Sequence, residues 1–226
     1  GGAMRSLVAF SPVIIMEQEP KGKLRREFAK PDSALKDLEK YSAILRDVRG
    51  ADHIFSFGED GARPFTKYAR QGAYHWRQYR EGKLSRIVDA TVAYVNSCEF
   101  KSVLDVGCGD GLYTSLMQNA VGIDNNKVAV RLARQHHVAA NHHSAYRIEE
   151  LGRFDAVTMF DVFEHLPFPK LMMEKLARVT NNIVIQNPTP NQSPWHYSEF
   201  QHDDLVAFVE RHGWRLLHRC GLGEND

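Results

Sequence analysis

The sequence predicts an α/β protein with a mostly parallel sheet and helices on both faces of the sheet. Two observations carry this prediction. The first is Val103–Gly111, where a short apolar run enters a turn with glycine at three alternate positions, a pattern typical of a buried strand followed by a tight turn. The second is that two further apolar runs, Val121–Asp124 and Phe154–Phe160, are each followed by a stretch with helical spacing, as in sheets with helical crossovers.

The glycine turn is predicted to bind a ligand. Alternate glycines permit positive φ and let a ligand approach the main chain, and a helix starting at Leu112 would point its first N–H groups into the turn. The turn reads G-x-G-x-G rather than the G-x-G-x-x-G of dinucleotide sites, and Asp105 and Asp110 would repel a pyrophosphate. S-adenosylmethionine, with an ammonium, a sulfonium and no phosphate, fits better. Asp124, at the end of the next strand, can accept both hydroxyls of a ribose.

Three segments together resemble a known family. Val103–Gly111, Val121–Asp124 and Phe154–Pro167 are similar to the first, second and fourth motifs of the class I S-adenosylmethionine-dependent methyltransferases. The resemblance covers about residues 101–217. It implies a Rossmann-like, mostly parallel sheet, S-adenosyl-L-methionine as the cofactor and S-adenosyl-L-homocysteine as its product.

The resemblance also implies which residues hold the cofactor. The predicted cofactor-binding residues are Tyr68, Trp76, Asp105, Gly107, Cys108, Gly109, Asp124, Asn125, Ser144, Ala145, Phe160 and Asp161. The family normally places an acidic or polar group beside the adenine after the third strand, and here Ser144, Ala145 and Tyr146 are the candidates. Phe160 and Asp161 are expected beside the methionine part and the transferred methyl group.

Two histidines are the predicted catalytic residues, His165 in the loop after the strand Phe154–Phe160 and His196 in a later loop. A histidine there can act as a general base because its ordinary pKa lies near neutrality. The alternative is that His165 and its neighbour Glu164 only shape the loop through hydrogen bonds.

A metal site is a second alternative at the same loop. Asp161, Glu164 and His165 have i, i+3, i+4 spacing, which would place them on one face if the loop were helical. With His196 they resemble the metal ligands Glu-x-x-Glu-His plus His of small-RNA 2′-O-methyltransferases and some ubiquinone-pathway O-methyltransferases. The first acid here is the shorter Asp, and no metal is assigned from the sequence.

The N-terminal part is expected to contribute helices. Residues 1–30 are interpreted as a cloning remnant (Gly1–Met4), an apolar segment and a basic linker. Residues 31–100 are interpreted as a helical lid, with helices over Pro31–Val48, Pro64–Tyr79 and Leu84–Ser97. By the resemblance, the lid aromatics Tyr68, Tyr74, His75 and Trp76 cover the cofactor or substrate. The alternative is that they pack the lid onto the core.

Residues 101–226 are expected to form the methyltransferase core. Its later elements are predicted as helices over Asn126–Gln135, Pro169–Val179 and Gln201–His212, and strands over Asn181–Gln186 and Trp214–Arg219. Too little chain follows for the family's seventh strand. Either the chain is a domain of a longer, multidomain protein, or Leu7–Met16 takes that place.

Composition narrows the function. The net charge is +1 and 43% of the residues are apolar, so there is no broad electrostatic footprint for nucleic acid. The cysteines Cys98, Cys108 and Cys220 form no C-x-x-C pair, which favours reduced thiols and a cytoplasmic location. No apolar run has the length of a membrane span. We therefore expect an O-methyltransferase acting on a small molecule or saccharide. A metal-assisted RNA 2′-O-methyltransferase and a non-catalytic module that binds the cofactor or a partner are the alternatives.

Overall fold

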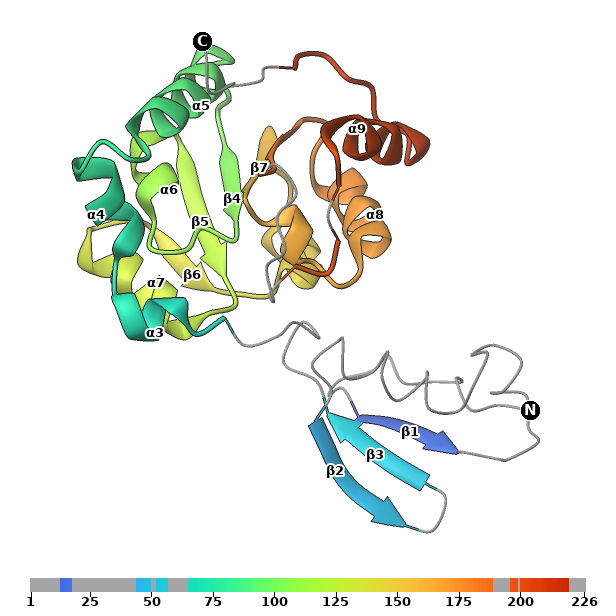
Figure 1. Ribbon diagram of the computed structural model, residues 1–226. Helices are drawn as coiled ribbons and strands as arrows, with labels where there is room; N and C mark the ends of the chain where they lie inside the picture. The colour runs from blue at the N-terminus through green and yellow to red at the C-terminus, as the bar shows by residue number, and fades with distance from the viewer. Residues whose placement is uncertain are drawn as a thin grey trace. The chain divides into compact units, whose positions relative to one another are not determined.

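The computed structural model describes residues 65–188, 196–198 and 200–219, together with the strands β1 (Val13–Glu17), β2 (Ile44–Arg49) and β3 (Asp52–Ser56). The chain divides into two units, residues 1–64 and residues 65–226. Both are drawn in Figure 1.

The first unit contains an antiparallel sheet with the strand order β1-β3-β2. The helix predicted over Pro31–Val48 is wrong for residues 44–48, which lie in β2. Two apolar residues at a three-residue step, Leu45 and Val48, are compatible with either structure, and pairing along β3 decides between them. The rest of that predicted helix and the apolar run Leu7–Phe10 lie outside the described residues.

The second unit is built on a five-stranded parallel sheet with the order β6-β5-β4-β7-β8. Its strands are β4 (Val103–Val106), β5 (Ala120–Asp124), β6 (Ala140–His142), β7 (Ala156–Phe160) and β8 (Ile183–Gln186). The chain passes outward from β4 to β6 and then returns to the other side of β4 with β7. In such open sheets ligands bind at the carboxyl ends of the strands beside this reversal. The predicted fold class is confirmed.

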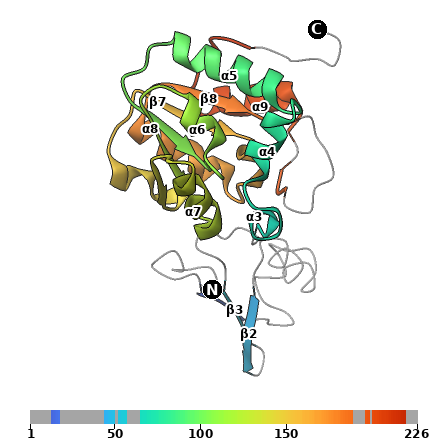
Figure 2. The ribbon, with the colours of Figure 1, turned by 90° about the vertical axis from the view of Figure 1, so that its left-hand side faces the viewer.

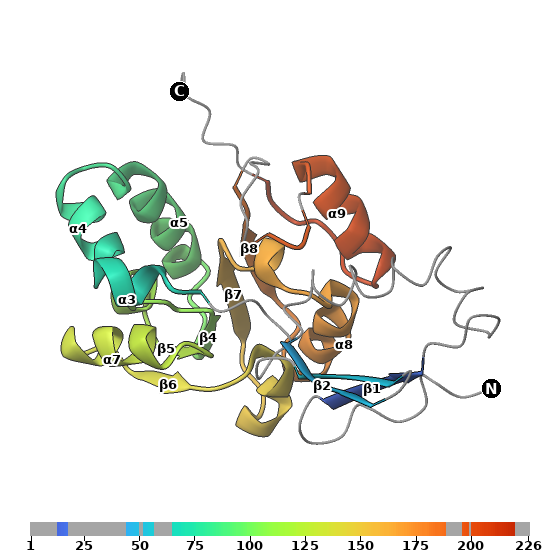
Figure 3. The same ribbon diagram turned by 60° about the horizontal axis from the view of Figure 1, so that its bottom comes forward.

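Helices cover both faces of this sheet, as Figures 1 and 2 show. They are α3 (Lys67–Gln71), α4 (Tyr74–Arg80), α5 (Ser85–Ser97), α6 (Leu112–Leu116), α7 (Lys127–Gln135), α8 (Pro169–Val179) and α9 (His202–Arg211), with short 3₁₀ segments η1 (Ala145–Leu151) and η2 (Phe163–His165). In Figure 3, α4, α5 and α7 lie on one side of the strands, and α8 and α9 on the other. None of the described helices combines the length and apolar character needed to cross a bilayer.

Two apolar layers hold the helices to the sheet. On one face, Val88 and Val92 of α5 pack with Leu112 of α6. On the other, Met172 and Leu176 of α8 pack with strand residues and with α9. The helical spacing that predicted α8 therefore reflects real burial, because each of these side chains removes apolar surface from water.

The structure differs from the sequence expectations at two further places. Gly72, with φ of 64°, divides the helix predicted over Pro64–Tyr79 into α3 and α4. The strand predicted over Trp214–Arg219 is wrong, because these residues are described without regular structure. Leu216 and Leu217 there are 46% and 73% exposed, so the apolar run does not mark a strand buried in the sheet.

Candidate active site

The glycine turn lies directly after β4 and is closed over by two side chains. Gly107 and Gly109 have φ of 72° and 57°, a conformation that favours glycine. A Cβ on Gly109 would lie 2.0 Å from the hydroxyl oxygen of Tyr68, and a Cβ on Gly107 would lie 2.4 Å from a methyl carbon of Val162. Only glycine fits at these positions, so the turn forms a cradle between the lid residue Tyr68 and the loop after β7.

Asp105, just before the turn, is buried with both of its carboxylate oxygens engaged. Its side chain is 2% exposed, and it accepts hydrogen bonds from the hydroxyls of Thr114 in α6 at 2.5 Å and Thr158 in β7 at 2.9 Å. Burial raises the pKa of Asp105 to about 6, although these two hydrogen bonds oppose the rise. The carboxylate thus joins β4, α6 and β7 beneath the turn, and its direct contact with a ligand stays a prediction.

Cys108, within the turn, is also buried, and burial raises the pKa of its thiol above the ordinary value. The main-chain N–H groups of Gly107 and Cys108 both donate to the carbonyl oxygen of Ile123, at 2.8 and 2.9 Å. The turn is therefore fastened to the end of β5. Cys98 and Cys108 are free thiols, and Cys220 lies outside the described residues.

Asp124, the last residue of β5, holds two main-chain groups. Its carboxylate accepts from the N–H of Gly109 at 2.9 Å and from the N–H of Asn126 at 2.7 Å. A carboxylate at the end of this strand is a group that can accept ribose hydroxyls, and that contact stays a prediction. Asn125 beside it is exposed, and its carbonyl lies 3.0 Å from Nε2 of His142.

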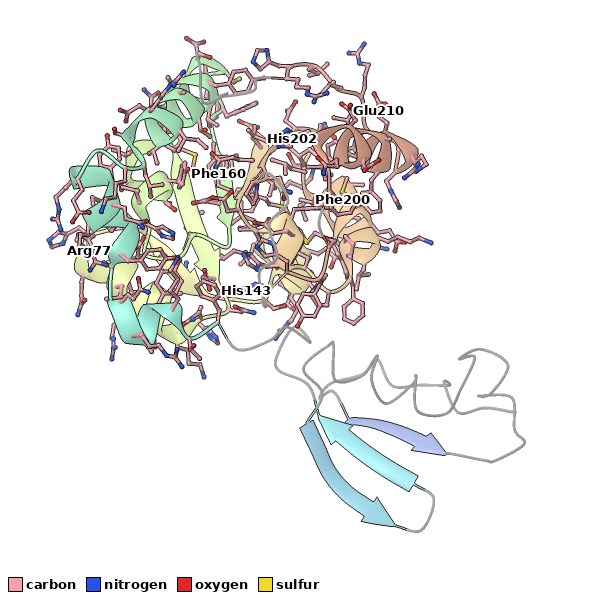
Figure 4. All side chains as sticks on the ribbon, viewed as in Figure 1. Arg77, His143, Phe160, Phe200, His202 and Glu210 are labelled. Atoms are coloured by element: carbon pink, nitrogen blue, oxygen red, sulfur yellow. The ribbon has the colours of Figure 1, made fainter. Side chains whose placement is uncertain are left out.

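The segment after β6 lies next to Asp124. The N–H of His143 donates to the main-chain carbonyl of Asp124 at 3.1 Å, and His143 is labelled in Figure 4. Ser144 follows, buried, with its hydroxyl oxygen accepting from the N–H of Tyr146 at 3.1 Å to cap η1. Ala145 packs against the core cluster. The structure thus brings the adenine candidates to the end of β5, and their contact with adenine stays a prediction.

The lid is fastened to the turn through Asp110. This carboxylate is 0% exposed and accepts from the main-chain N–H of His75 at 3.0 Å, with Nδ1 of His75 at 3.1 Å from its other oxygen. The indole N–H of Trp76 donates to the carbonyl of Asp110 at 2.8 Å. The sequence indicated Asp110 as one of two acids that would repel a pyrophosphate. In the structure Asp110 forms the hydrogen bonds that hold the lid helix α4.

The predicted lid aromatics separate into two groups. Tyr68 and Tyr74 are buried, at 7% and 4% exposed, and the Tyr68 hydroxyl lies over Gly109. Trp76 instead stacks on His136 at the end of α7, with ring centroids 4.3 Å apart. The structure therefore places the Tyr68 hydroxyl over the turn, while Trp76 reaches the turn through its indole N–H and stacks its ring on His136 at the end of α7.

Asp161 follows β7 in a conformation that few non-glycine residues adopt, with φ of 52°. Its side chain is exposed, yet surrounding protein raises its pKa, with His75 and His196 near enough to oppose that rise. Phe160, just before Asp161 and labelled in Figure 4, is buried. Its ring centroid lies 4.7 Å from that of Tyr113 in α6.

Glu164, His165 and His196 converge beyond Asp161. One potential ligand atom from each lies within 4.8 Å of the others. Nε2 of His165 is 3.8 Å from one oxygen of Glu164, and the two imidazole centroids are 4.8 Å apart. The N–H groups of Tyr197 and Ser198 donate to the Glu164 carbonyl, which brings the later loop to η2.

Glu164 carries an unusual buried carboxylate. It is 1% exposed, and burial raises its pKa to about 8. One of its side-chain oxygens has no hydrogen-bond partner among the residues that the structure describes. Such a group calls for an explanation, and a carboxylate with two imidazoles is a donor set that suits a divalent transition metal. The residues therefore fit a metal ion, although Asp161, the fourth residue considered from the sequence, does not belong to this cluster.

Sequence reasoning missed three polar residues around Asp161. The side chain of Gln186 donates to Asp161 and accepts from the hydroxyls of Thr91 and Tyr113. The available signal was Gln186 itself, a polar residue that ends an apolar strand at the edge of the sheet where ligands bind. Thr91 and Tyr113 gave none, because they lie in helices where polar residues are common.

Comparison with known proteins identifies related chains. A family model described as a methyltransferase domain matches residues 75–222. The ubiquinone biosynthesis O-methyltransferase of Alkalilimnicola ehrlichii is 38% identical over 147 residues, which cover 56% of this chain and 60% of that protein. That of Dechloromonas aromatica is 37% identical over 91 residues, which cover 35% and 39%. The chain thus spans 60% or less of the length of these relatives.

A solved structure has the same fold. The magnesium protoporphyrin IX methyltransferase from Synechocystis PCC 6803, determined with bound S-adenosylmethionine, aligns with a TM-score of 0.52 and 17% sequence identity. The alignment covers 67% of this chain and 85% of that one. At this identity the likeness concerns the arrangement of the sheet and its helices.

Proposed function

Because this chain belongs to the S-adenosylmethionine-dependent class I methyltransferases, we propose that it transfers a methyl group from S-adenosylmethionine to a hydroxyl oxygen of a small molecule. The observation that carries the proposal is the turn after β4, where Asp124 holds the N–H of Gly109 at 2.9 Å beneath the hydroxyl of Tyr68. This arrangement supports a ribose site at Asp124 beside the glycine turn.

The cofactor fits the cradle on chemical grounds. Glycine at positions 107 and 109 lets Val162 and Tyr68 close over the turn, and the carboxylates of Asp105, Asp110 and Asp124 favour a cationic ligand over a phosphorylated one. Asp124 would hold the ribose, the turn with Tyr68 would hold the methionine end, and Ser144 and Ala145 would face the adenine. The bound cofactor supplies a methyl group activated by its positive sulfur.

The acceptor side supplies groups that can move a proton. His165 and His196 lie in one cluster with Glu164, in the segments that follow β7 and β8. An acceptor hydroxyl between them would give its proton to an imidazole while its oxygen bonds to the methyl carbon, the bond from that carbon to sulfur breaks and S-adenosylhomocysteine leaves. Because the positive charge on sulfur falls in the transition state, positioning and exclusion of water would supply most of the acceleration. The relatives are named as O-methyltransferases of ubiquinone biosynthesis, which supports an oxygen acceptor on a small molecule.

Binding and transfer measurements test this proposal. We expect calorimetry to show binding of S-adenosylmethionine and S-adenosylhomocysteine but not of NAD. With labelled cofactor we expect methyl transfer to simple hydroxyl acceptors, for which catechol and a phenyl glycoside are suitable probes. Binding of NAD in place of S-adenosylmethionine would contradict the cofactor assignment. Cofactor binding without transfer to any hydroxyl acceptor would favour the non-catalytic alternative.

A metal-assisted form of the same reaction is the second candidate. The unpartnered, buried oxygen of Glu164 beside two imidazoles favours it. A divalent ion there would keep Glu164 ionised and bind the acceptor oxygen. Calorimetry with Mn²⁺ on wild type and Glu164→Gln, in the absence of cofactor, tests the site directly. Loss of transfer on chelation and recovery with Mn²⁺ would support metal assistance, and unchanged transfer in the chelator would exclude it.

A further inference from the structure

The last residue of β8, Gln186, is the centre of a polar network at the carboxyl ends of β7 and β8. In the parallel register Gln186 pairs with Phe160, the residue before Asp161. Its side-chain oxygen accepts from the hydroxyl of Thr91 in α5 at 2.9 Å and from that of Tyr113 in α6 at 3.2 Å. Its side-chain N–H donates to the carboxylate of Asp161 at 3.3 Å.

The chemistry of the partners fixes the orientation of this amide. An ionised carboxylate can only accept hydrogen bonds, so the NH₂ group of Gln186 must face Asp161. The carbonyl oxygen then faces the hydroxyls of Thr91 and Tyr113, which can both donate. All three contacts are satisfied in this orientation of the amide, whereas the flipped amide would set its oxygen against the Asp161 carboxylate and lose that hydrogen bond. The side chain is therefore locked by residues from two helices.

Gln186 also supports the main chain of Asp161. The N–H of Asp161 donates to the carbonyl of Gln186 at 2.9 Å, so this glutamine holds the aspartate by both backbone and side chain. Asp161 needs such support, because its φ of 52° is unfavourable for a residue with a side chain. Strained backbone of this kind persists where the surroundings enforce it.

The supported carboxylate lies at the carboxyl end of β7, the edge of the sheet where ligands bind in this kind of fold. Asp161 is also exposed. On the basis of the proposed methyl transfer, we propose that Gln186 is a positioning residue that aims the carboxylate of Asp161 at the acceptor. Thr91 and Tyr113 hold Gln186 in the required orientation.

Two substitutions separate this role from simple support of the sheet. Gln186→Leu removes all three side-chain hydrogen bonds. Gln186→Glu keeps an oxygen that accepts from Thr91 and Tyr113 but places an acceptor opposite the Asp161 carboxylate. With catechol as the acceptor, we expect both variants to lower kcat/KM about tenfold, with the Kd for S-adenosylmethionine changed less than twofold. Gln118→Leu, an exposed glutamine between α6 and β5, is the matched control and should behave as wild type.

A double-mutant cycle tests whether Gln186 acts through Asp161. Asp161→Asn removes the charge, and asparagine tolerates the left-handed backbone. We expect Gln186→Leu to have no further effect on kcat/KM in the Asp161→Asn background, because the group it positions is already lost. Fully multiplicative effects, or wild-type activity of Gln186→Glu, would overturn the proposal.

Crystal structures distinguish failure of this proposal from failure of the proposed function. If wild type binds no S-adenosylmethionine or transfers no methyl group, the proposed function fails and the kinetic readout is lost. The positioning of Asp161 can still be seen in ligand-free crystals of wild type, Gln186→Leu and Gln186→Glu. We expect the Asp161 carboxylate to turn away from its wild-type direction in both variants. An unmoved carboxylate overturns the proposal.

Discussion

The carboxyl ends of β4 and β5 and those of β7 and β8 lie at one edge of the same sheet, but their buried acids are satisfied differently. On the β4–β5 side, Asp105 and Asp110 have hydroxyl, imidazole and main-chain donors supplied by the chain itself. On the β7–β8 side, Glu164 has a buried oxygen without a partner among the described residues, and Asp161 is exposed.

This difference fits two different tasks. Under the proposed function, the β4–β5 side would bind a cofactor of fixed shape, so its turn can be fully braced before the ligand arrives, which reduces the cost of ordering on binding. The β7–β8 side would exchange protons and accept substrate, and groups with incomplete partners are typical of such places. The comparison gives four predictions, ordered by the size of the expected effect.

The largest effect is expected from removing both imidazoles on the β7–β8 side. The double variant His165→Ala/His196→Ala should lower kcat about 1000-fold at saturating cofactor, or about 4 kcal/mol in the barrier, because general base catalysis contributes on this scale. Methyl transfer to catechol with labelled cofactor measures it. His218→Ala is the control, since that histidine stacks on Tyr94 near the end of α5. Unchanged kcat in the double variant would show that neither histidine transfers the proton.

The second prediction concerns how the burial of Asp105 makes the free energy of unfolding depend on pH. Its pKa in the folded protein, about 6, lies above its ordinary value of 3.8, so the folded state binds the proton more tightly than the unfolded state. The contribution of this group to the unfolding free energy is fully present below pH 4, where the carboxyl is protonated. It is lost as the pH rises through 6 and the buried group ionises. Relative to Asp105→Asn, the unfolding free energy of wild type should fall by up to about 3 kcal/mol between pH 4 and 7.

Urea unfolding of both proteins at several pH values measures this difference. Asp155→Asn, at an exposed aspartate before β7, is the matched control and should give a curve parallel to wild type. If the Asp105→Asn curve is also parallel to wild type, the buried carboxylate is not the source of the pH dependence.

The third prediction isolates the acid at the end of β5. Asp124→Ala removes the acceptor for the N–H groups of Gly109 and Asn126 and the proposed ribose ligand. The Kd for S-adenosylmethionine should rise about 100-fold, or about 2.7 kcal/mol, as measured by calorimetry. Asp155→Ala, which loses only a main-chain contact to Lys101 at the opposite edge, should change the Kd less than twofold. Equal Kd values for both variants would contradict the assignment.

The smallest effect tests the lid contact on the β4–β5 side. Gly109→Ala places a methyl group against the Tyr68 hydroxyl, whereas Gly152, with φ of 89°, has no atom within 4 Å of the corresponding position. Both substitutions strain the backbone, but only Gly109→Ala should weaken cofactor binding, by about tenfold or about 1.4 kcal/mol. Adding Tyr68→Phe to Gly109→Ala should restore part of the affinity, because it removes the hydroxyl. Equal binding by the two alanine variants would show that the lid contact is irrelevant.

Much of the β4–β5 side could be predicted from the sequence because its determinants are local. The turn needs glycine at Gly107 and Gly109 for reasons of φ and space, and Asp124 ends the adjacent parallel strand. Such requirements lie within a few residues of one another and leave a readable pattern. The apolar spacing of α8 was readable for the same reason, since one face of the helix is buried along its whole length.

The β7–β8 side was decided by tertiary structure. His196 meets His165 only because the N–H groups of Tyr197 and Ser198 bind the carbonyl of Glu164, and Gln186 gathers partners from two helices. The same holds for β2, where pairing with β3 replaced an expected helix. Local spacing determined the glycine turn and the fold class. Contacts between distant segments decided which polar groups lie together, because the free energy of those contacts depends on partners that no short stretch of sequence contains.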